Sequence, residues 1–215
     1  MTRANRLILL GAGGHAKVIA ELARAAGWQV TGFLAPRNNR GEENLGAPLL
    51  GDGADLTADP SWLEQSDLFP AIGEGEIRWR EFVRLAAAGA RVPSLIHPSA
   101  VVSPSARIEA GAVVMAGAII QADSVVGPAA IVNTGAQVDH DCTIGAGAMV
   151  APGAVLCGAV HIGDHAFVGA GAVIVPGIQI GRGAFVGAGT TVVNDLSDGT
   201  QLKASRRSQV APIAE

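Results

Sequence analysis

The sequence predicts a chain of two parts: a Rossmann-like α/β domain over residues 1–92, followed by an all-β left-handed parallel β-helix of hexapeptide repeats over residues 93–215. Three observations support this prediction. The first part alternates apolar strands with amphipathic helices, whereas the second part repeats every six residues. All three tryptophans lie in the first part, and so sharp a change of composition within 215 residues indicates two units.

The N-terminal part begins with a strand, a glycine turn and a helix. Residues 7–10 are apolar, and the segment GAGGHAKVIAELARAAGW predicts a turn leading into an amphipathic helix that ends near Gly27. Strands that alternate with helices indicate a small parallel sheet. Further strands are expected at residues 30–34, 67–72 and 91–96, and a second helix at residues 76–88.

The glycine turn has the spacing Gly11-x-Gly13-x-x-Ala16. Such a turn at the start of a helix offers backbone N–H groups to a phosphate and predicts a nucleotide site, with a purely structural turn as the alternative. A nicotinamide cofactor is not expected, because the second strand ends in Ala35 and Pro36, where an acidic residue would hold the ribose.

The second part carries the strongest pattern in the chain. Stepping by six residues from Ile96 to Val192 meets a branched aliphatic side chain at each of seventeen positions, usually with a small residue two positions earlier. We expect one short strand per hexapeptide, with the aliphatic side chain inward, and three hexapeptides per coil, so that residue n lies beneath residue n + 18. The repeats then make roughly five to six coils, each rising about 4.8 Å.

Charge and composition narrow the possible partners. No Lys or Arg lies between Arg107 and Arg182, and the formal net charge is −4, so nucleic acid is not expected as a partner. Neither a signal peptide nor a membrane span is expected, which predicts a soluble, cytoplasmic protein. The cysteines, Cys142 and Cys157, are expected as reduced thiols.

The segment NTGAQVDHDC places His140 between Asp139 and Asp141, in a region with few other charges. Because Val138 is expected inward, His140 falls near a corner of the coil, where its side chain can leave the core. A neutral imidazole there can act as a general base, and either neighbouring carboxylate can orient the ring. The 18-residue coil places Gly158 against His140, where the Gly158 N–H can stabilise an oxyanion.

Two other chemistries compete for the same region. Cys142 is a possible nucleophile, but it occupies the small inward position before Ile144 and is expected to be buried. His161 and His165 suggest, as an alternative, a zinc site of the γ-carbonic anhydrase type. However, His161 does not stack on His140 in the 18-residue coil, and a catalytic zinc needs three converging ligands. We therefore expect no metal.

Three segments together, GAGGHAK, the Ala-Ile-Gly at 71–73 and NTGAQVDHDC, resemble the sugar acyltransferase family of sialic acid O-acetyltransferase and bacillosamine N-acetyltransferase. The resemblance covers essentially the whole chain. It implies a homotrimer that moves an acetyl group from acetyl coenzyme A to a nucleotide-linked sugar, often a 4-amino-4,6-dideoxy sugar bound by the front domain, usually in surface polysaccharide biosynthesis. It also implies His140 as the catalytic base, with Asp141 orienting its ring.

The resemblance assigns further residues to ligands. Coenzyme A is expected in a groove between adjacent β-helices, with contacts at Gly158, Gly169, Ala170, Val175, Pro176 and Gly187. The UDP- or GDP-linked amino sugar is expected at Gly11, Gly13, Gly14, His15, Lys17, Ala35, Pro36, Gly73, Glu74 and Asn133. Two of these residues have an alternative role: Asn133 could cap a turn, and His15 could be a solvated residue in the first helical turn.

The chain departs from the family at two places. Ala35 and Pro36 replace a common acidic pair, which leaves room for a guanosine nucleotide, as in the GDP-perosamine N-acetyltransferases. The segment GTQLKASRR at 199–207 replaces the usual Gly-x-Pro-Ala-Lys ending near the adenine. The main hypothesis is N-acetylation of a 4-amino sugar, and the alternatives are an O-acetyltransferase acting on sialic acid or another hydroxyl, a zinc lyase and a non-catalytic trimeric scaffold.

Overall fold

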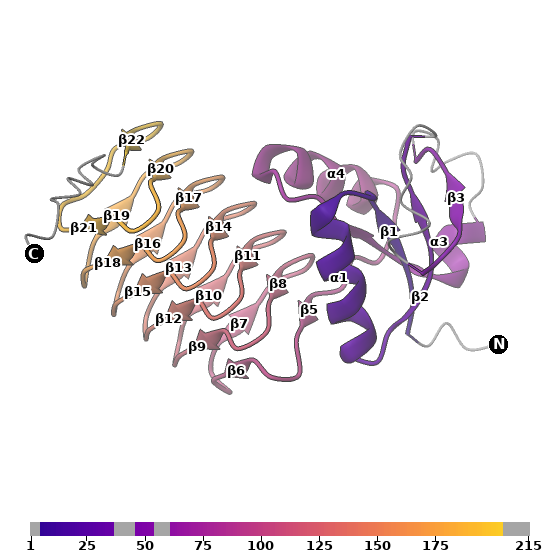
Figure 1. The fold of residues 1–215 in the computed structure, drawn as a ribbon, viewed down its shortest axis with the longest axis horizontal. Helices are drawn as coiled ribbons and strands as arrows, with labels where there is room; N and C mark the ends of the chain where they lie inside the picture. The colour runs from indigo at the N-terminus through magenta and orange to yellow at the C-terminus, as the bar shows by residue number, and fades with distance from the viewer. Residues whose placement is uncertain (1–4, 37–45, 54–60, 204–215) are drawn as a thin grey trace, which may run out of the picture.

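The computed structural model describes residues 5–36, 46–53 and 61–203. It consists of an α/β domain followed by a left-handed β-helix of hexapeptide repeats, as predicted (Figure 1). Among the described residues, no helix combines the length and the apolar character that crossing a membrane requires.

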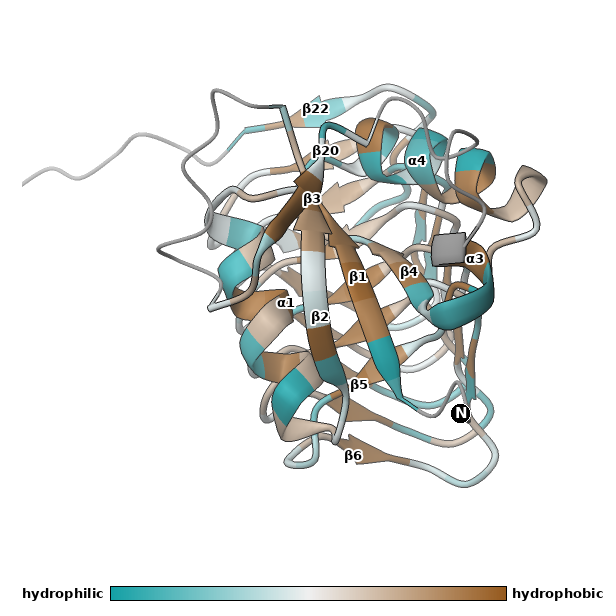
Figure 2. Ribbon diagram, turned by 90° about the vertical axis from the view of Figure 1, so that its right-hand side faces the viewer, coloured by the Kyte–Doolittle hydropathy of each residue, from teal (hydrophilic) through white to brown (hydrophobic). Residues whose placement is uncertain are grey.

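The α/β domain is built on a four-stranded parallel sheet. Its strands are ordered β3-β2-β1-β4, and helices α1 and α4 lie between the sheet and the β-helix (Figures 1 and 2). The strands are β1 (Arg6–Leu10), β2 (Gln29–Leu34), β3 (Leu49–Gly51) and β4 (Asp67–Pro70), and the helices are α1 (Gly14–Ala25), α3 (Ser61–Gln65) and α4 (Gly75–Ala87).

The prediction of a strand over residues 91–96 is wrong for most of that range. Only β5 (Leu95–Ile96) forms there, and it belongs to the β-helix. Arg91 touches the front sheet through one backbone bond, in which Leu68 N–H donates to the Arg91 carbonyl (3.1 Å). Pro93 follows, and because proline has no N–H, the pairing does not continue.

The β-helix is a prism with three parallel sheets as its faces. The second residue of each strand from β5 to β21 is one of the seventeen repeating aliphatics, and strands stack at an offset of eighteen residues, as between Val126 and Ile144.

The six-stranded face comprises β6 (Val101–Val102), β9 (Ile119–Ile120), β12 (Gln137–Val138), β15 (Val155–Leu156), β18 (Val173–Ile174) and β21 (Thr191–Val192). The five-stranded face comprises β7 (Arg107–Ile108), β10 (Val125–Val126), β13 (Thr143–Ile144), β16 (His161–Ile162) and β19 (Gln179–Ile180). The seven-stranded face comprises β5, β8 (Val113–Val114), β11 (Ile131–Val132), β14 (Met149–Val150), β17 (Phe167–Val168), β20 (Phe185–Val186) and β22 (Gln201–Leu202).

The inward aliphatics form one continuous core, with an exception at its start. Val126, Val132 and Ile144 are completely buried, whereas Ile96 is 36% exposed. The expectation that every repeat residue points into a closed core is therefore wrong at the first coil. No coil precedes it to cover Ile96 on that side.

The seven-stranded face is apolar on its outside as well. The outward residues Leu95, Val113 and Ile131 are completely buried because the α/β domain packs on them. One hydrophobic cluster thus joins the two parts of the chain, and this contact fixes the front domain over one face of the prism.

Candidate active site

The glycine turn has the geometry that a phosphate site needs. Gly11 has a φ of +118°, and a Cβ there would lie 2.8 Å from the Ala71 carbonyl oxygen, so only glycine fits. Helix α1 begins after Gly13 without a side-chain cap. Added Cβ atoms at Gly13 and Gly14 would meet nothing within 4 Å. The uncapped first turn of α1 therefore faces open space, where its N–H groups can bind an anion.

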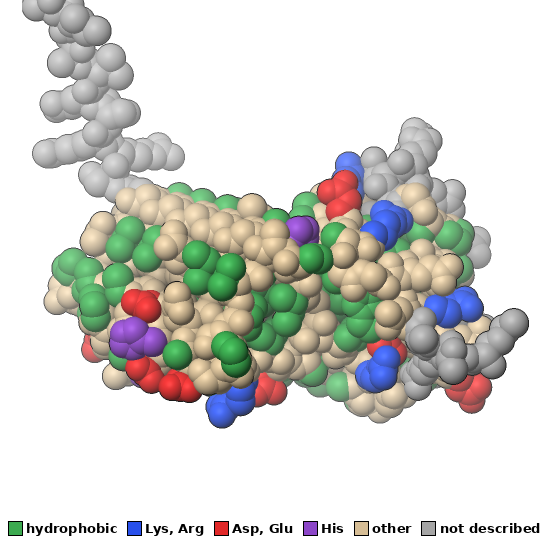
Figure 3. Space-filling view, turned by 90° about the horizontal axis from the view of Figure 1, so that it is seen from below, with side chains coloured by type: hydrophobic (Ala, Val, Ile, Leu, Met, Phe, Trp, Pro, Cys, Tyr) green, Lys and Arg blue, Asp and Glu red, His purple; other side chains and the backbone are tan. Residues whose placement is uncertain are grey.

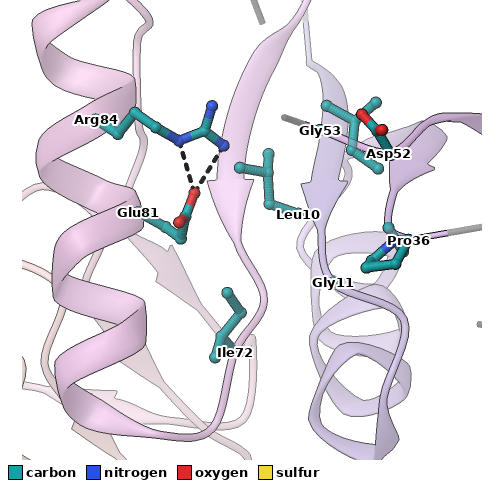
Figure 4. A pocket seen from close by; sticks show the side chains of 10 residues that line it. Leu10, Gly11, Pro36, Asp52, Gly53, Ile72, Glu81 and Arg84 are labelled. Atoms are coloured by element: carbon teal, nitrogen blue, oxygen red, sulfur yellow. Dashed lines mark hydrogen bonds and ion pairs between the residues drawn. The ribbon is translucent and has the colours of Figure 1, made fainter. Parts of the chain in front are cut away.

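A cavity of about 380 Å³ opens beside Gly11, at the carboxyl ends of the strands (Figure 4). Ala35 and Pro36, which are predicted to lie on the nucleoside side of a nucleotide site, line this cavity. The three charged side chains that line it were missed by the sequence analysis: Asp52, Glu81 and Arg84. The Arg84 Nε donates to Glu81 Oε2 (2.8 Å). Asp52 follows a short strand and could have been suspected from that position, whereas the i,i+3 pair on α4 had no distinctive pattern.

His15 lies at the junction of the loops that carry Gly11 and Gly73. Its Nε2 is buried without a hydrogen-bond partner, and its ring lies beside Gly73. Burial and the nearby Arg78 charge lower the pKa of His15 to about 4. The side chain is therefore neutral at physiological pH, and the alternative of a solvated His15 is wrong. Lys17, two residues further along α1, is exposed.

Glu74, which directly precedes α4, does not line the cavity at Gly11. Together with Gly73 it borders a second cavity of about 390 Å³, which Phe167 and Phe185 also line. These two rings are stacked, with centroids 5.1 Å apart. Of the predicted sugar-binding residues, Glu74 is thus separated from Ala35 and Pro36.

The Asp-His-Asp step forms the turn between β12 and β13, which we call the His140 corner. The His140 Nδ1 is 2.7 Å from Asp141 Oδ2, and the His140 backbone N–H donates to Asp139 Oδ1 (2.8 Å). The ring is exposed. The hydrogen bond to Asp141, aided by the charge of Asp139, raises the pKa of His140. With a proton on Nδ1 shared with Asp141, Nε2 carries the lone pair that a base needs.

Gly158 lies directly against the His140 ring, as the 18-residue coil predicts. A Cβ at Gly158 would stand 2.7 Å from both Cε1 and Nε2 of His140. The two turns are also joined by a backbone bond from Ala159 N–H to the His140 carbonyl (2.9 Å). Only a residue without a side chain leaves the ring in this position.

The residues expected to bind coenzyme A lie at two different corners of the prism. Val175 and Pro176 follow Gly158 along the His140 corner. The remaining three lie across the six-stranded face, at the Asn133 corner, where the seven-stranded and six-stranded faces meet; they are Gly169, Ala170 and Gly187. At that corner the Asn133 Oδ1 accepts a bond from Thr134 N–H (2.8 Å), which is the turn-capping role named as its alternative. Of the segment at 199–207 expected near the adenine, residues 204–207 lie outside the described residues.

The competing residues are dispersed. Cys142 is completely buried, and burial raises the pKa of its thiol. His161 is exposed on the five-stranded face, whereas His165 packs edge-on against Trp79, with ring centroids 6.0 Å apart. Within the described residues, no group of three or more His, Cys, Asp or Glu side chains has the arrangement of a metal site.

Arg78 is a residue that sequence reasoning missed. It is completely buried, and among the described residues its guanidinium donates to backbone carbonyl groups. Nη1 donates to Ile72 (3.1 Å) and Gly73 (2.8 Å) in the front domain, while the other nitrogens donate to the β-helix, at Ala129 (2.7 Å), Gly147 (2.8 Å) and Ala148 (3.3 Å). Arg78 therefore ties the backbone at Ile72 and Gly73 to two coils of the prism.

Comparison with known proteins supports both halves of the fold. The model of the PglD N-terminal domain matches residues 6–85, and the model of the bacterial transferase hexapeptide, with six repeats, matches residues 159–194. No curated protein sequence matches the chain.

Solved structures are similar over nearly the whole chain. The acetyltransferase domain of PglB from Neisseria gonorrhoeae is 41% identical with a TM-score of 0.84, covering 93% of this chain and 97% of that one. A His→Asn mutant of perosamine N-acetyltransferase from Caulobacter crescentus, in complex with CoA and GDP-perosamine, is 42% identical with a TM-score of 0.87, covering 94% of each chain. WeeI from Acinetobacter baumannii is 26% identical, with a TM-score of 0.81, covering 92% of this chain and 96% of that one. The chain therefore belongs to the family of sugar N-acetyltransferases that join a PglD N-terminal domain to hexapeptide repeats.

Proposed function

We propose that the protein transfers an acetyl group from acetyl coenzyme A to the 4-amino group of a nucleotide-linked dideoxy sugar, with His140 as the general base. The observation that carries the proposal is the exposed His140 ring, held by Asp141 at 2.7 Å and lying against Gly158. Relatives 40% and 42% identical support it, because the first was solved with acetyl coenzyme A and the second with CoA and GDP-perosamine.

The reaction proceeds by direct attack. The sugar amine, in its neutral form, attacks the thioester carbon while its excess proton passes to His140 Nε2. Negative charge develops on the carbonyl oxygen, and the Gly158 N–H is the proposed donor to it. The tetrahedral intermediate then expels the coenzyme A sulfur, to which His140 returns the proton, so that the products are an amide and a thiol. Asp141 stabilises the imidazolium formed in between.

The nucleotide is proposed to occupy the cavity at Gly11, Ala35 and Pro36, with its diphosphate at the first turn of α1. The cavity wall at Ala35 and Pro36 is apolar, without the acidic pair expected for a uridine nucleotide. A GDP-linked 4-amino sugar is therefore the preferred substrate within the proposed class. A cytoplasmic location is proposed with it, since both co-substrates are cytoplasmic metabolites.

A homotrimer explains why the coenzyme A residues fall on two corners. The His140 corner and the Asn133 corner flank the six-stranded face, and three copies with this face toward a common axis bring one corner of each copy against the other corner of its neighbour. The outer surface of this face carries several apolar side chains, among them Val101, which is 61% exposed (Figure 3). Asp139 and Cys157 line a cavity of about 240 Å³ on it. Helix α1 packs near the Asn133 corner, close to Thr134, so a neighbour's His140 would complete the glycine-loop site.

The test is release of coenzyme A thiol from acetyl coenzyme A in the presence of UDP- and GDP-linked sugars that carry a 4-amino or a 4-hydroxyl group. We expect turnover with an amino sugar, highest with a GDP-linked one, and a trimer by analytical ultracentrifugation. His140→Asn is the matched control. Turnover with a hydroxyl acceptor alone would establish the O-acetyltransferase alternative, and stoichiometric zinc with no thiol release would establish the lyase.

A further inference from the structure

The turns at the corners of the prism are normally closed by a backbone hydrogen bond. The residue at the small inward position donates its N–H to the carbonyl three residues earlier, as in Ala136 to Asn133 (3.0 Å) and Ala118 to Met115 (3.2 Å). Alanine occupies most of these inward positions, and it has no side-chain group that could interfere with the bond.

The turn that carries His140 differs from this pattern. Among the hydrogen bonds of the described residues there is none from Cys142 N–H to the Asp139 carbonyl. Instead, Cys142 N–H donates to Ser124 Oγ (3.0 Å), and Ser124 Oγ donates to the Asp139 carbonyl (2.6 Å). A hydroxyl from the preceding coil is thus inserted into the turn, and it holds the residues on both sides of the His140–Asp141 pair.

The next turn along the same corner repeats the arrangement with sulfur. Cys142 Sγ donates to the Cys157 carbonyl (3.2 Å), and the Val160 N–H bonds to the same thiol. The turn over Cys157 and Gly158 is therefore also bridged from inside. Both turns that face the proposed chemistry are bridged by an inward donor, and Ser124 and Cys142 occupy successive levels of one column.

Ser124 is completely buried, so its hydroxyl has no water to replace these partners. If it is removed, the Asp139 carbonyl and the Cys142 N–H must either stay unsatisfied or close the turn onto each other. Closing the turn changes the backbone between them, where Asp141 has a φ of 58° and its carboxylate is held on the His140 ring.

We propose that Ser124 is a positioning residue: its hydroxyl spaces the turn so that Asp141 holds the His140 ring against Gly158. This inference rests on the proposed role of His140 as base. It assigns a function to the one serine in the inward column beneath the corner, and it makes Cys142 the equivalent structural donor for the turn of Gly158.

The test compares Ser124→Ala with Ser124→Cys and with Val132→Ala, which removes a core side chain at the seven-stranded face. The pKa of the His140 ring is measured by NMR titration, and kcat and KM are measured with acetyl coenzyme A and the best amino sugar. For Ser124→Ala we expect the pKa of His140 to fall and kcat to drop about tenfold, with the KM for acetyl coenzyme A changed by less than about twofold. Ser124→Cys, with a weaker donor, should lie between wild type and Ser124→Ala.

A purely structural role predicts another result. Ser124→Ala would then resemble Val132→Ala, with a lower melting temperature but with the pKa of His140 and kcat unchanged, and this outcome would overturn the proposal. If Ser124→Ala does not fold, Ser124→Cys decides, because an unchanged His140 pKa and kcat in that variant also overturns it. The NMR titration needs no turnover, so it separates failure of this inference from failure of the proposed acetyl transfer.

Discussion

His140 and His15 are the two histidines predicted to take part in the site, and they have opposite surroundings. The His140 ring is 59% exposed at the edge of a regular scaffold, beside a carboxylate that raises its pKa. The His15 ring is enclosed between loops of the front domain, where burial and Arg78 lower its pKa to about 4. Only His140 can accept and hold a proton near neutral pH.

The opposite pKa shifts of His140 and His15 indicate different roles for the β-helix and the front domain. The β-helix corner presents the imidazole of His140, the proposed base, in water-accessible surroundings, where carboxylates can adjust its affinity for protons. The junction of the front domain holds a histidine that stays neutral and can only bond to a ligand or pack against it. The four substitutions below test this division, from the largest expected effect to the smallest.

His140→Asn should abolish most turnover, because it removes the base but keeps a polar side chain of similar reach. The expected loss in kcat is about 10²–10⁴-fold, with an unchanged melting temperature. His15→Asn is the comparison, and steady-state kinetics should show its effect mainly in KM for the nucleotide sugar. Equal losses of kcat in the two variants would contradict the assignment of the base to His140.

Arg78→Met should weaken the connection between the two regions. The substitution leaves buried carbonyls of both domains without their donor, and we expect the free energy of unfolding to fall by about 3 kcal/mol or more. Chemical denaturation measures the change. Arg80→Met, on the exposed side of the same helix, is the matched control and should alter stability by less than about 0.5 kcal/mol. Similar effects of the two substitutions would show that Arg78 does not hold the domains together.

Gly158→Ala should displace the His140 ring without unfolding the coil. The new Cβ would meet the ring at 2.7 Å, and an exposed side chain can rotate away at little cost. We expect kcat to fall by about tenfold. In a double-mutant cycle the same substitution should have almost no further effect in the His140→Asn background. An undiminished effect there would mean that Gly158 acts independently of the ring.

Asp141→Asn should shift the pH dependence of the reaction. The hydrogen bond from Asp141 raises the pKa of His140, so its loss lowers that pKa and leaves the ring neutral at more acidic pH. The acidic limb of kcat/KM should therefore move to lower pH, while the rate on the plateau falls severalfold because the ring is less well oriented. Asp139→Asn should produce a smaller shift in the same direction. A limb that moves to higher pH contradicts this account of the raised pKa.

The regular part of the fold was predictable in detail because its pattern is local. Branched residues at every sixth position specify the strands, and the coil of eighteen residues brings His140 over Gly158, as arithmetic on the sequence anticipated. An available signal was overlooked: the outward positions Leu95, Val113 and Ile131, spaced by eighteen, are all apolar. That spacing indicates a covered face of the prism, on which the α/β domain packs.

The sequence alone determined the repeat, the inward core, the glycine turn and the Asp139–His140–Asp141 step at a corner of the coil, because each depends on neighbours along the chain or on a fixed period. Tertiary structure alone decided that Arg78 joins two domains, that His15 is sealed and neutral, and that the Ser124 hydroxyl enters the turn of His140. These properties arise from contacts between segments that no period relates. Burial, which sets the cost of an unpaired polar group, exists only once those segments have packed.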